Sequence, residues 1–169
     1  MKMRILNVAS WLLVLLTNAC MGQKTFDEKI TSLLNNTVPI VKEEELEQML
    51  KTDKNLTILD ARSAEEYEVS HIEGARFIDY DDFDQSMLQG LSKEDTVVVY
   101  CSVGYRSEKI GEKLQKLGYK NVLNLYGGIF DWKNKGHEVV DNKGVNTDSV
   151  HTYNKSWSQW LYKGVKVYE

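Results

Sequence analysis

Residues 96–107 read Thr-Val-Val-Val-Tyr-Cys-Ser-Val-Gly-Tyr-Arg-Ser. The first five are mostly β-branched or aromatic, which is typical of a strand buried on both faces of a parallel sheet. Apolar residues at helical spacing over 107–117, followed by Gly118 as a C-terminal glycine, predict a helix directly afterwards. Residues 101–106 therefore form a loop between a buried strand and a helix.

Strands and helices alternate on both sides of this stretch. Short apolar runs predict strands over 56–59, 75–78 and 122–125, with an edge strand over 38–41 because Pro39 cannot donate to a ladder. Helices are predicted from Glu43, from Ser63 with Glu66 in a capping box, and over 129–133. This order indicates an α/β fold with a central parallel sheet flanked by helices. Ligands of such sheets bind beyond the carboxyl ends of the strands, where Asp60 and Cys101 fall.

The loop over 101–106 combines a nucleophile with a site for anions. Backbone N–H groups of a tight loop that enters a helix point inward, and the helix N-terminus adds about half a positive charge. Arg106 adds a full positive charge, and Gly104 permits a turn that a side chain would obstruct. We expect these groups to keep Cys101 as the nucleophilic thiolate beside a bound anion.

Composition excludes several classes of protein. The 169 residues fit one domain of ~100–200 residues. Lys and Arg number 21 against 25 Asp and Glu, and a net charge of −4 gives no basic surface for nucleic acid. Two cysteines are too few for a disulfide scaffold or a cysteine-rich zinc module. His137 and His151 have no companion ligands at metal spacing, so we expect no metal site.

The first twenty residues resemble an export signal. Two basic residues precede an apolar run over 5–16, and a helix of that length spans ~18 Å, too little to cross a ~30 Å hydrocarbon core. Residues 17–20, Thr-Asn-Ala-Cys, resemble the lipobox of bacterial lipoproteins, with Thr17 where leucine is usual. We therefore expect a signal peptide over 1–19, lipidation of Cys20, and an exported protein, periplasmic or anchored to a membrane by the lipid.

The remaining chain is predicted to form a tether over 20–37, with a short helix in it as an option, a folded domain over 38–141 and a C-terminal extension over 142–169. In the extension, aromatic residues between 153 and 161 lie near helical spacing, and 165–168 alternates like a strand. We expect the extension to pack back on the domain, with a role at a pocket rim or in partner docking as the alternative.

Four segments of the chain resemble motifs of the rhodanese family of sulfurtransferases, in the order that the family has them. Residues 59–67 resemble its Leu-Asp-x-Arg and Glu-Tyr motif, 71–75 its His-Ile-x-Gly-Ala signature, 98–107 its active loop and 127–132 its closing motif. Ser70 stands where the family usually has glycine, and Asp79 where proline or asparagine is common. The resemblance covers the predicted domain and not the C-terminal extension.

The resemblance implies a rhodanese-like fold, with helices on both faces of the sheet, and sulfur transfer through a covalent intermediate. Cys101 would take sulfane sulfur from a small anionic donor such as thiosulfate and pass it, as a persulfide, to a thiol or cyanide. Arg106 is the second catalytic residue that it implies, as a group that helps to hold the donor. The substrate-binding residues it implies are Ser102, Val103, Gly104, Tyr105 and Ser107. No cofactor is implied, and no protein partner is identified.

Four polar residues near the loop are predicted to be structural: Asp60, Arg62, Glu66 and His71. Asp60 ends a strand, and Arg62 and Glu66 are four residues apart and can pair on a helix. His71 falls in a turn of the family signature, where we expect it to form hydrogen bonds within the fold.

Two other functions stay open. A module that carries sulfur or senses redox state without turnover would use the same chemistry at Cys101. A cysteine-dependent phosphatase would hold phosphate in the same loop, but Arg106 is five residues after Cys101 rather than six, and a shorter loop encloses a smaller anion site.

Overall fold

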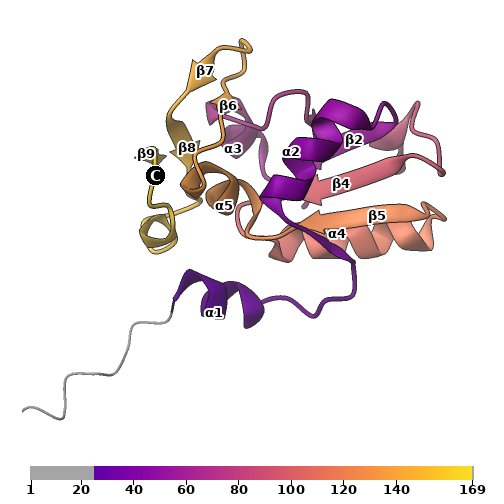
Figure 1. Ribbon diagram of the computed structural model, residues 1–169, viewed down its shortest axis with the longest axis horizontal. Helices are drawn as coiled ribbons and strands as arrows, with labels where there is room; N and C mark the ends of the chain where they lie inside the picture. The colour runs from indigo at the N-terminus through magenta and orange to yellow at the C-terminus, as the bar shows by residue number, and fades with distance from the viewer. Residues whose placement is uncertain (1–24, 169) are drawn as a thin grey trace, which may run out of the picture.

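The computed structural model describes residues 25–168, so the predicted signal peptide over 1–19 and the predicted lipidation site Cys20 lie outside the described residues. The centre of the fold is a five-stranded parallel sheet with the strand order β1-β5-β4-β2-β3. Figure 1 labels β5, β4 and β2 of this sheet. Its strands are β1 (Ile40–Val41), β2 (Leu56–Asp60), β3 (Arg76–Phe77), β4 (Thr96–Tyr100) and β5 (Asn121–Leu125). The predicted α/β fold with a central parallel sheet is confirmed.

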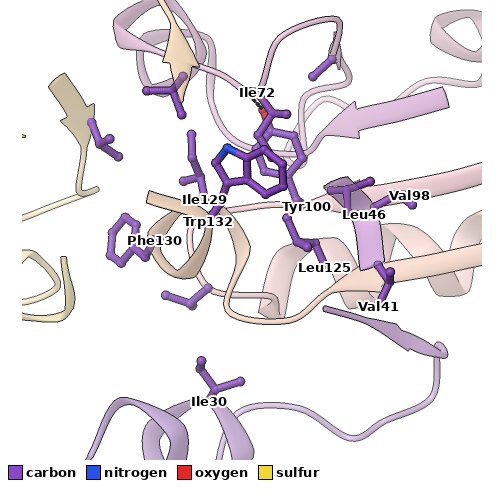
Figure 2. Packing of buried hydrophobic residues seen from close by; sticks show 14 of the residues in the cluster. Ile30, Val41, Leu46, Ile72, Val98, Tyr100, Leu125, Ile129, Phe130 and Trp132 are labelled. Carbon is purple, nitrogen blue, oxygen red and sulfur yellow. Dashed lines mark hydrogen bonds between the residues drawn. The ribbon is translucent and has the colours of Figure 1, made fainter. Parts of the chain in front are cut away.

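Helices cover both faces of this sheet. They are α1 (Phe26–Thr31), α2 (Glu43–Thr52), α3 (Ala64–Val69), α4 (Tyr105–Lys116) and α5 (Gly128–Asn134), with a 3₁₀ turn η1 (Gln85–Leu88). Val98 of β4 belongs to a cluster with Leu46 of α2 and Ile129 of α5 (Figure 2). Its neighbour Val97 belongs to a second cluster with Ile110 of α4. Successive side chains of a strand point to opposite faces, which is why β4 is apolar throughout.

The register of β2 and β4 brings their carboxyl ends level. Asp60 is the ladder partner of Tyr100, and the N–H of Ala61 donates to the carbonyl of Tyr100 at 2.8 Å. The residues that follow the two strands therefore share one edge of the sheet. This is the edge at which parallel sheets bind ligands.

The segment over 20–37, predicted as a tether, is corrected where the structure describes it. Thr25 and Glu28 form a capping box that starts α1, and Phe26, Ile30 and Leu34 are buried in the same cluster as Val98. Phe26, Ile30 and Leu34 have the i, i+4, i+8 spacing of a helical stripe, and a stripe of this kind must be covered by other apolar groups. The segment is therefore part of the folded body.

The C-terminal extension packs back on the domain, as expected. It contains the strands β8 (Ser149–His151) and β9 (Val165–Val167), which pair in parallel, and the 3₁₀ turn η2 (Ser158–Trp160). Trp160 stacks on Phe26 with ring centroids 5.8 Å apart, and Leu161 is fully buried. The predicted strand is confirmed as β9, but the helical spacing before it yields only the short turn η2. The two ends of the described chain thus share one apolar cluster.

A second small sheet completes the fold. β6 (Val139–Val140) pairs antiparallel with β7 (Asn146–Thr147), and an isolated bridge joins His71 to Val140. Over residues 25–168, no helix combines the length and the apolar character needed to cross a membrane.

Candidate active site

Cys101 is the first residue after β4, at the carboxyl edge of the sheet. Its Sγ accepts a hydrogen bond from the backbone N–H of Gly104, with N and S 3.2 Å apart. The residue is only 1% exposed, yet it contributes to the wall of a pocket. The sulfur is therefore held by the loop, in a buried residue that lines a pocket.

The loop is shorter than the sequence predicted, because α4 begins at Tyr105 and not at Ser107. Gly104 is the N-cap with φ +108°, a left-handed conformation that favours glycine. Glycine has no side chain, so no side chain caps the helix. The first N–H groups of an α-helix have no partner within the helix, and together with the helix dipole they attract anions. Arg106 consequently lies in the first turn of α4, beside this anion-binding end.

The Cys101 loop rests on the N-terminus of α5. Backbone N–H groups of Ile129 and Phe130 donate to the carbonyls of Cys101 and Ser102 at 2.9 and 3.2 Å. Gly128 has φ +55°, and a Cβ placed on it would overlap the carbonyl oxygen of Cys101. Gly128 thus allows the backbones of α5 and the Cys101 loop to approach closely, which fixes the position of the loop against α5.

Arg106 is bound to Glu66 across the loop. Its Nη1 and Nη2 donate to Oε2 and Oε1 of Glu66 at 2.7 and 2.8 Å, and Nη2 also donates to Oγ of Ser102 at 2.9 Å. Ser102 in turn donates to Glu66 at 2.8 Å. The predicted pairing of Glu66 with Arg62 is therefore wrong. The carboxylate of Glu66 instead links α3 to the active loop.

Burial opposes the ionisation of Glu66, but hydrogen bonds from Arg106 and the positive charges of Arg106 and Arg62 outweigh it and lower its pKa to about 2. Burial also opposes the charge on Arg106, and the hydrogen bonds and charge of Glu66 raise its pKa above the ordinary value. Both groups are thus charged over the whole physiological range. The positive charge that Arg106 presents to an anion near Cys101 is therefore largely neutralised by the carboxylate of Glu66.

A buried network supports the loop from the β2 side. Arg62 donates to both carboxylate oxygens of Asp60 and to the carbonyl of Ser70. Tyr100 donates its hydroxyl to Asp60 at 2.6 Å and accepts the N–H of Ile72. Both Asp60 and Arg62 are fully buried and do not line the pocket. These contacts hold the ends of β2 and β4 together.

His71 is likewise placed within the fold. Its backbone exchanges two hydrogen bonds with Val140, its Nδ1 lies 3.1 Å from the carbonyl oxygen of Tyr67, and its ring stacks on that of Tyr67 with centroids 3.9 Å apart.

A pocket of about 390 Å³ lies against the loop. Its lining residues are Leu33, Tyr80, Asp81, Cys101, Ser102, Val103, Tyr105, Arg106, Tyr153 and Trp157. Five of the seven loop residues predicted for the site are among them. Gly104 contributes its N–H to Cys101 instead, and Ser107 is fully buried.

Comparison of the chain with known protein families gives one match that contains this site. A family model, the rhodanese-like domain, matches residues 42–135. The chain belongs to the rhodanese-like family. The resemblance drawn from the four motifs is confirmed at this level, and the matched range contains the Cys101 loop, Glu66 and Gly128. It does not contain α1 or the C-terminal extension, which flank the rhodanese domain.

Several relatives of the rhodanese domain are known. A putative sulfur carrier protein of Bacillus subtilis is 33% identical over 100 residues, which are 59% of this chain and 54% of that protein. The tRNA uridine(34) hydroxylase of Photorhabdus laumondii is 36% identical over 104 residues, 58% of this chain and 29% of that protein. The chain therefore spans about half the length of one curated relative and less than a third of the other.

Solved structures agree with the fold. A protein of Bacillus halodurans has a TM-score of 0.58 and 26% identity, covering 70% of this chain and 88% of that one. The rhodanese-like domain of an Anabaena protein has a TM-score of 0.56 and 26% identity, covering 61% of this chain and 79% of that one.

Sequence reasoning missed Asn124, which supports the rhodanese loop from β5. Ser107 donates its hydroxyl to Oδ1 of Asn124 at 2.7 Å, and Nδ2 of Asn124 donates to the carbonyl of Gly104 at 3.0 Å. Ser107, predicted to bind substrate, therefore positions the first turn of α4. The signal in the sequence was Asn124 itself, a polar residue within the otherwise apolar strand predicted over 122–125.

Glu66→Gln is expected to destabilise the domain by about 3 kcal/mol at neutral pH. The pKa of Glu66 falls from 4.5 to about 2 on folding, and such a shift is worth about 3 kcal/mol at ~1.4 kcal/mol per pKa unit. Because the folded-state pKa is the lower one, this stabilisation is complete above pH 4.5 and is lost as the pH falls toward 2. Urea unfolding at several pH values measures the difference between wild type and variant.

The matched control for this measurement is Glu47→Gln. Glu47 pairs with Lys51 at 2.8 Å on the exposed face of α2, where water screens the pair and little stability is lost. If Glu66→Gln costs no more than Glu47→Gln, or if its effect does not shrink between pH 4.5 and 2, the role given to the pair with Arg106 is wrong.

Proposed function

We propose that this rhodanese domain is a sulfurtransferase whose nucleophile is Cys101. The observation that supports the proposal most is the environment of the sulfur: Sγ accepts the N–H of Gly104 at 3.2 Å, at the uncapped N-terminus of α4, and Cys101 is one of the residues that line the pocket. A helix N-terminus stabilises a thiolate and a bound anion alike. The loop thus combines the nucleophile with the donors that an anionic substrate needs.

The reaction has two steps in which atoms and electrons balance. The Cys101 thiolate attacks the outer sulfur of a donor such as thiosulfate; the donor's S–S bond breaks, and sulfite leaves with the bonding electron pair. Cys101 then carries a persulfide. A thiolate or cyanide attacks the outer sulfur of that persulfide, its S–S bond breaks, and the electron pair returns to Cys101 as thiolate.

The role we give to Arg106 differs from the one that the resemblance implied. Its side chain is only 17% exposed, and its guanidinium is held by Glu66 and Ser102. Arg106 therefore fixes the shape of the loop and adds its field to that of the helix, while first-turn N–H groups of α4 contact the donor. In this proposal it is a positioning residue.

A sulfur carrier is the second candidate, because one relative is a putative sulfur carrier protein. A carrier would load and release one sulfur at Cys101 but would need a partner for each step. The phosphatase alternative uses the same loop with an aryl phosphate. Steady-state assays of the full chain separate the three functions.

The decisive assay supplies thiosulfate and cyanide and follows thiocyanate. Many turnovers per protein molecule are expected. Formation of no more than one thiocyanate per molecule would favour the carrier, and phosphate release from p-nitrophenyl phosphate without thiocyanate would favour the phosphatase.

We also propose that the protein is exported and anchored through lipid at Cys20, as the sequence of the first twenty residues suggests. Metabolic labelling of the full chain with a fatty acid analogue in a bacterial host is expected to label the wild type and not Cys20→Ser. Label that persists in Cys20→Ser would contradict this proposal. Cys101→Ser is the control, and its labelling should equal that of the wild type.

A further inference from the structure

Part of the wall of the Cys101 pocket comes from outside the rhodanese domain. Leu33 follows α1, and Tyr153 and Trp157 lie between β8 and η2, whereas the family match ends at residue 135. These three side chains line the pocket together with Tyr80 and Tyr105. The flanking segments therefore add apolar and aromatic surface to a loop whose chemistry needs none.

Tyr153 is held at the pocket in an unfavourable backbone conformation. Its φ is +63°, which bulky residues rarely adopt, and its side chain is 57% exposed, so burial does not explain its position. Its N–H donates to Nδ1 of His151 at 3.2 Å, and its ring lies over the guanidinium of Arg106 at 5.6 Å. Strain of this kind clusters at functional sites.

Trp157 is fixed beside it. Its N–H is within hydrogen-bond distance of Asn154 Oδ1 at 3.2 Å, its ring lies under the ammonium of Lys29 at 4.9 Å, and it packs against the main apolar cluster. The turn that follows is anchored by buried Trp160 and Leu161. The aromatic wall is thus held in place before a substrate arrives, which lowers the entropic cost of binding.

The charges and the size of the pocket indicate what fits. Its charged lining residues are Arg106, which is already paired with Glu66, and Asp81, which is acidic. Thiosulfate is a five-atom anion with the volume of a few water molecules at ~30 Å³ each, and the pocket has about 390 Å³. Pockets with apolar and aromatic walls and few polar groups bind organic molecules.

We propose that the flanking segments make this pocket selective for a thiol acceptor with an uncharged aromatic or apolar body, and that Tyr153 and Trp157 determine this selectivity. The inference rests on the proposed sulfurtransferase function. The acceptor's thiolate attacks the outer sulfur of the Cys101 persulfide, the S–S bond breaks with its electrons returning to Cys101, and the acceptor leaves as a persulfide. Its body meanwhile lies against the two rings.

The test separates loading from transfer. The full chain is loaded with thiosulfate, intact mass confirms one added sulfur, and single-turnover transfer is followed to phenylmethanethiol and to ethanethiol. Aromatic contacts of ~0.5–1.5 kcal/mol correspond to a preference of up to about tenfold for the first acceptor in the wild type. The preference should arise from a tighter apparent affinity for phenylmethanethiol than for ethanethiol, and not from a faster transfer rate at saturating thiol.

Tyr153→Gly is the informative variant. Glycine adopts positive φ readily, so the variant removes the ring and relieves the strain, and it is expected to fold. We expect the ratio of transfer to phenylmethanethiol over transfer to ethanethiol to fall toward one in this variant, with intact mass confirming that one sulfur is loaded before either thiol is added. Tyr153→Phe keeps the ring and should keep the preference, and Trp157→Leu should reduce it.

Three results would overturn the inference. The wild type could show no preference between the two thiols, Tyr153→Gly could keep the full preference, or Tyr153→Gly could slow both acceptors by the same factor. If thiosulfate adds no sulfur at all, the proposed sulfurtransferase function is wrong, and the inferred selectivity for aromatic thiols is wrong for the same reason. The intact mass before acceptor is added tells that outcome from the other three.

Discussion

Cys101→Ser is expected to reduce the sulfur transfer rate at least ~10³-fold, as loss of a covalent nucleophile does. A serine hydroxyl is not ionised near neutral pH and cannot hold a sulfane sulfur. The fold should persist, because the side chain keeps nearly the same shape and the Gly104 N–H can donate to an oxygen as it does to Sγ. Thiocyanate formation measures the loss, and thermal unfolding checks the fold.

Cys20→Ser is the matched control for the loss of a thiol. It removes the other cysteine of the sequence and leaves the rhodanese loop unchanged. Cys20→Ser is expected to form thiocyanate at the wild-type rate. Substantial turnover in Cys101→Ser, with the fold intact, would show that the chemistry resides elsewhere.

Gly128→Ala is expected to lower both stability and activity, the latter about 10²-fold. The new Cβ would overlap the carbonyl oxygen of Cys101, an atom that also accepts the N–H of Ile129 at 2.9 Å. The loop must move to relieve this overlap, and a displacement of ~1 Å of a reacting group can cost 10²-fold in rate. Its left-handed backbone, with φ +55°, adds a conformational cost of ~1–2 kcal/mol.

Gly144→Ala isolates the conformational cost. Gly144 has φ +75° with no neighbouring atom within 4 Å of the added Cβ. This variant is expected to lose ~1–2 kcal/mol and to keep wild-type turnover. Equal behaviour of the two variants in both unfolding and turnover would mean that contact between α5 and the Cys101 loop does not position the sulfur.

The sequence predicted the sheet and the place of the loop well, because both depend on local pattern. The apolar run over 96–100 required cover on two faces, and α2, α5 and α4 provide it. The capping box of Ser63 and Glu66 is present as predicted. Gly118 likewise follows α4 with φ +91°.

The partners of buried charges were harder to predict. Helical spacing favoured Arg62 as the partner of Glu66, but Asp60 is closer to Arg62 in space, and Arg106 reaches Glu66 from 40 residues away. Which charges meet across a sheet edge depends on the register of β2 and β4. That register is a property of the tertiary structure and not of one segment.

The part of the pocket wall formed by Leu33, Tyr153 and Trp157 was harder to predict, because local pattern offered a pocket rim for the C-terminal extension only as an alternative. Leu33 lies in a segment that reads as polar, and the spacing of Tyr153 and Trp157 suggested a helix that does not form. Contacts between the two ends of the described chain, such as the stacking of Phe26 on Trp160, place these residues at the loop.

The central claim is that Cys101 takes up sulfur as a persulfide in its loop. Intact mass spectrometry of the full chain after exposure to thiosulfate tests it most directly. The account predicts a gain of one sulfur atom in the wild type, carried by the peptide that contains Cys101, reversed by a thiol and absent from Cys101→Ser. No gain in the wild type, or the same gain in Cys101→Ser, would contradict it.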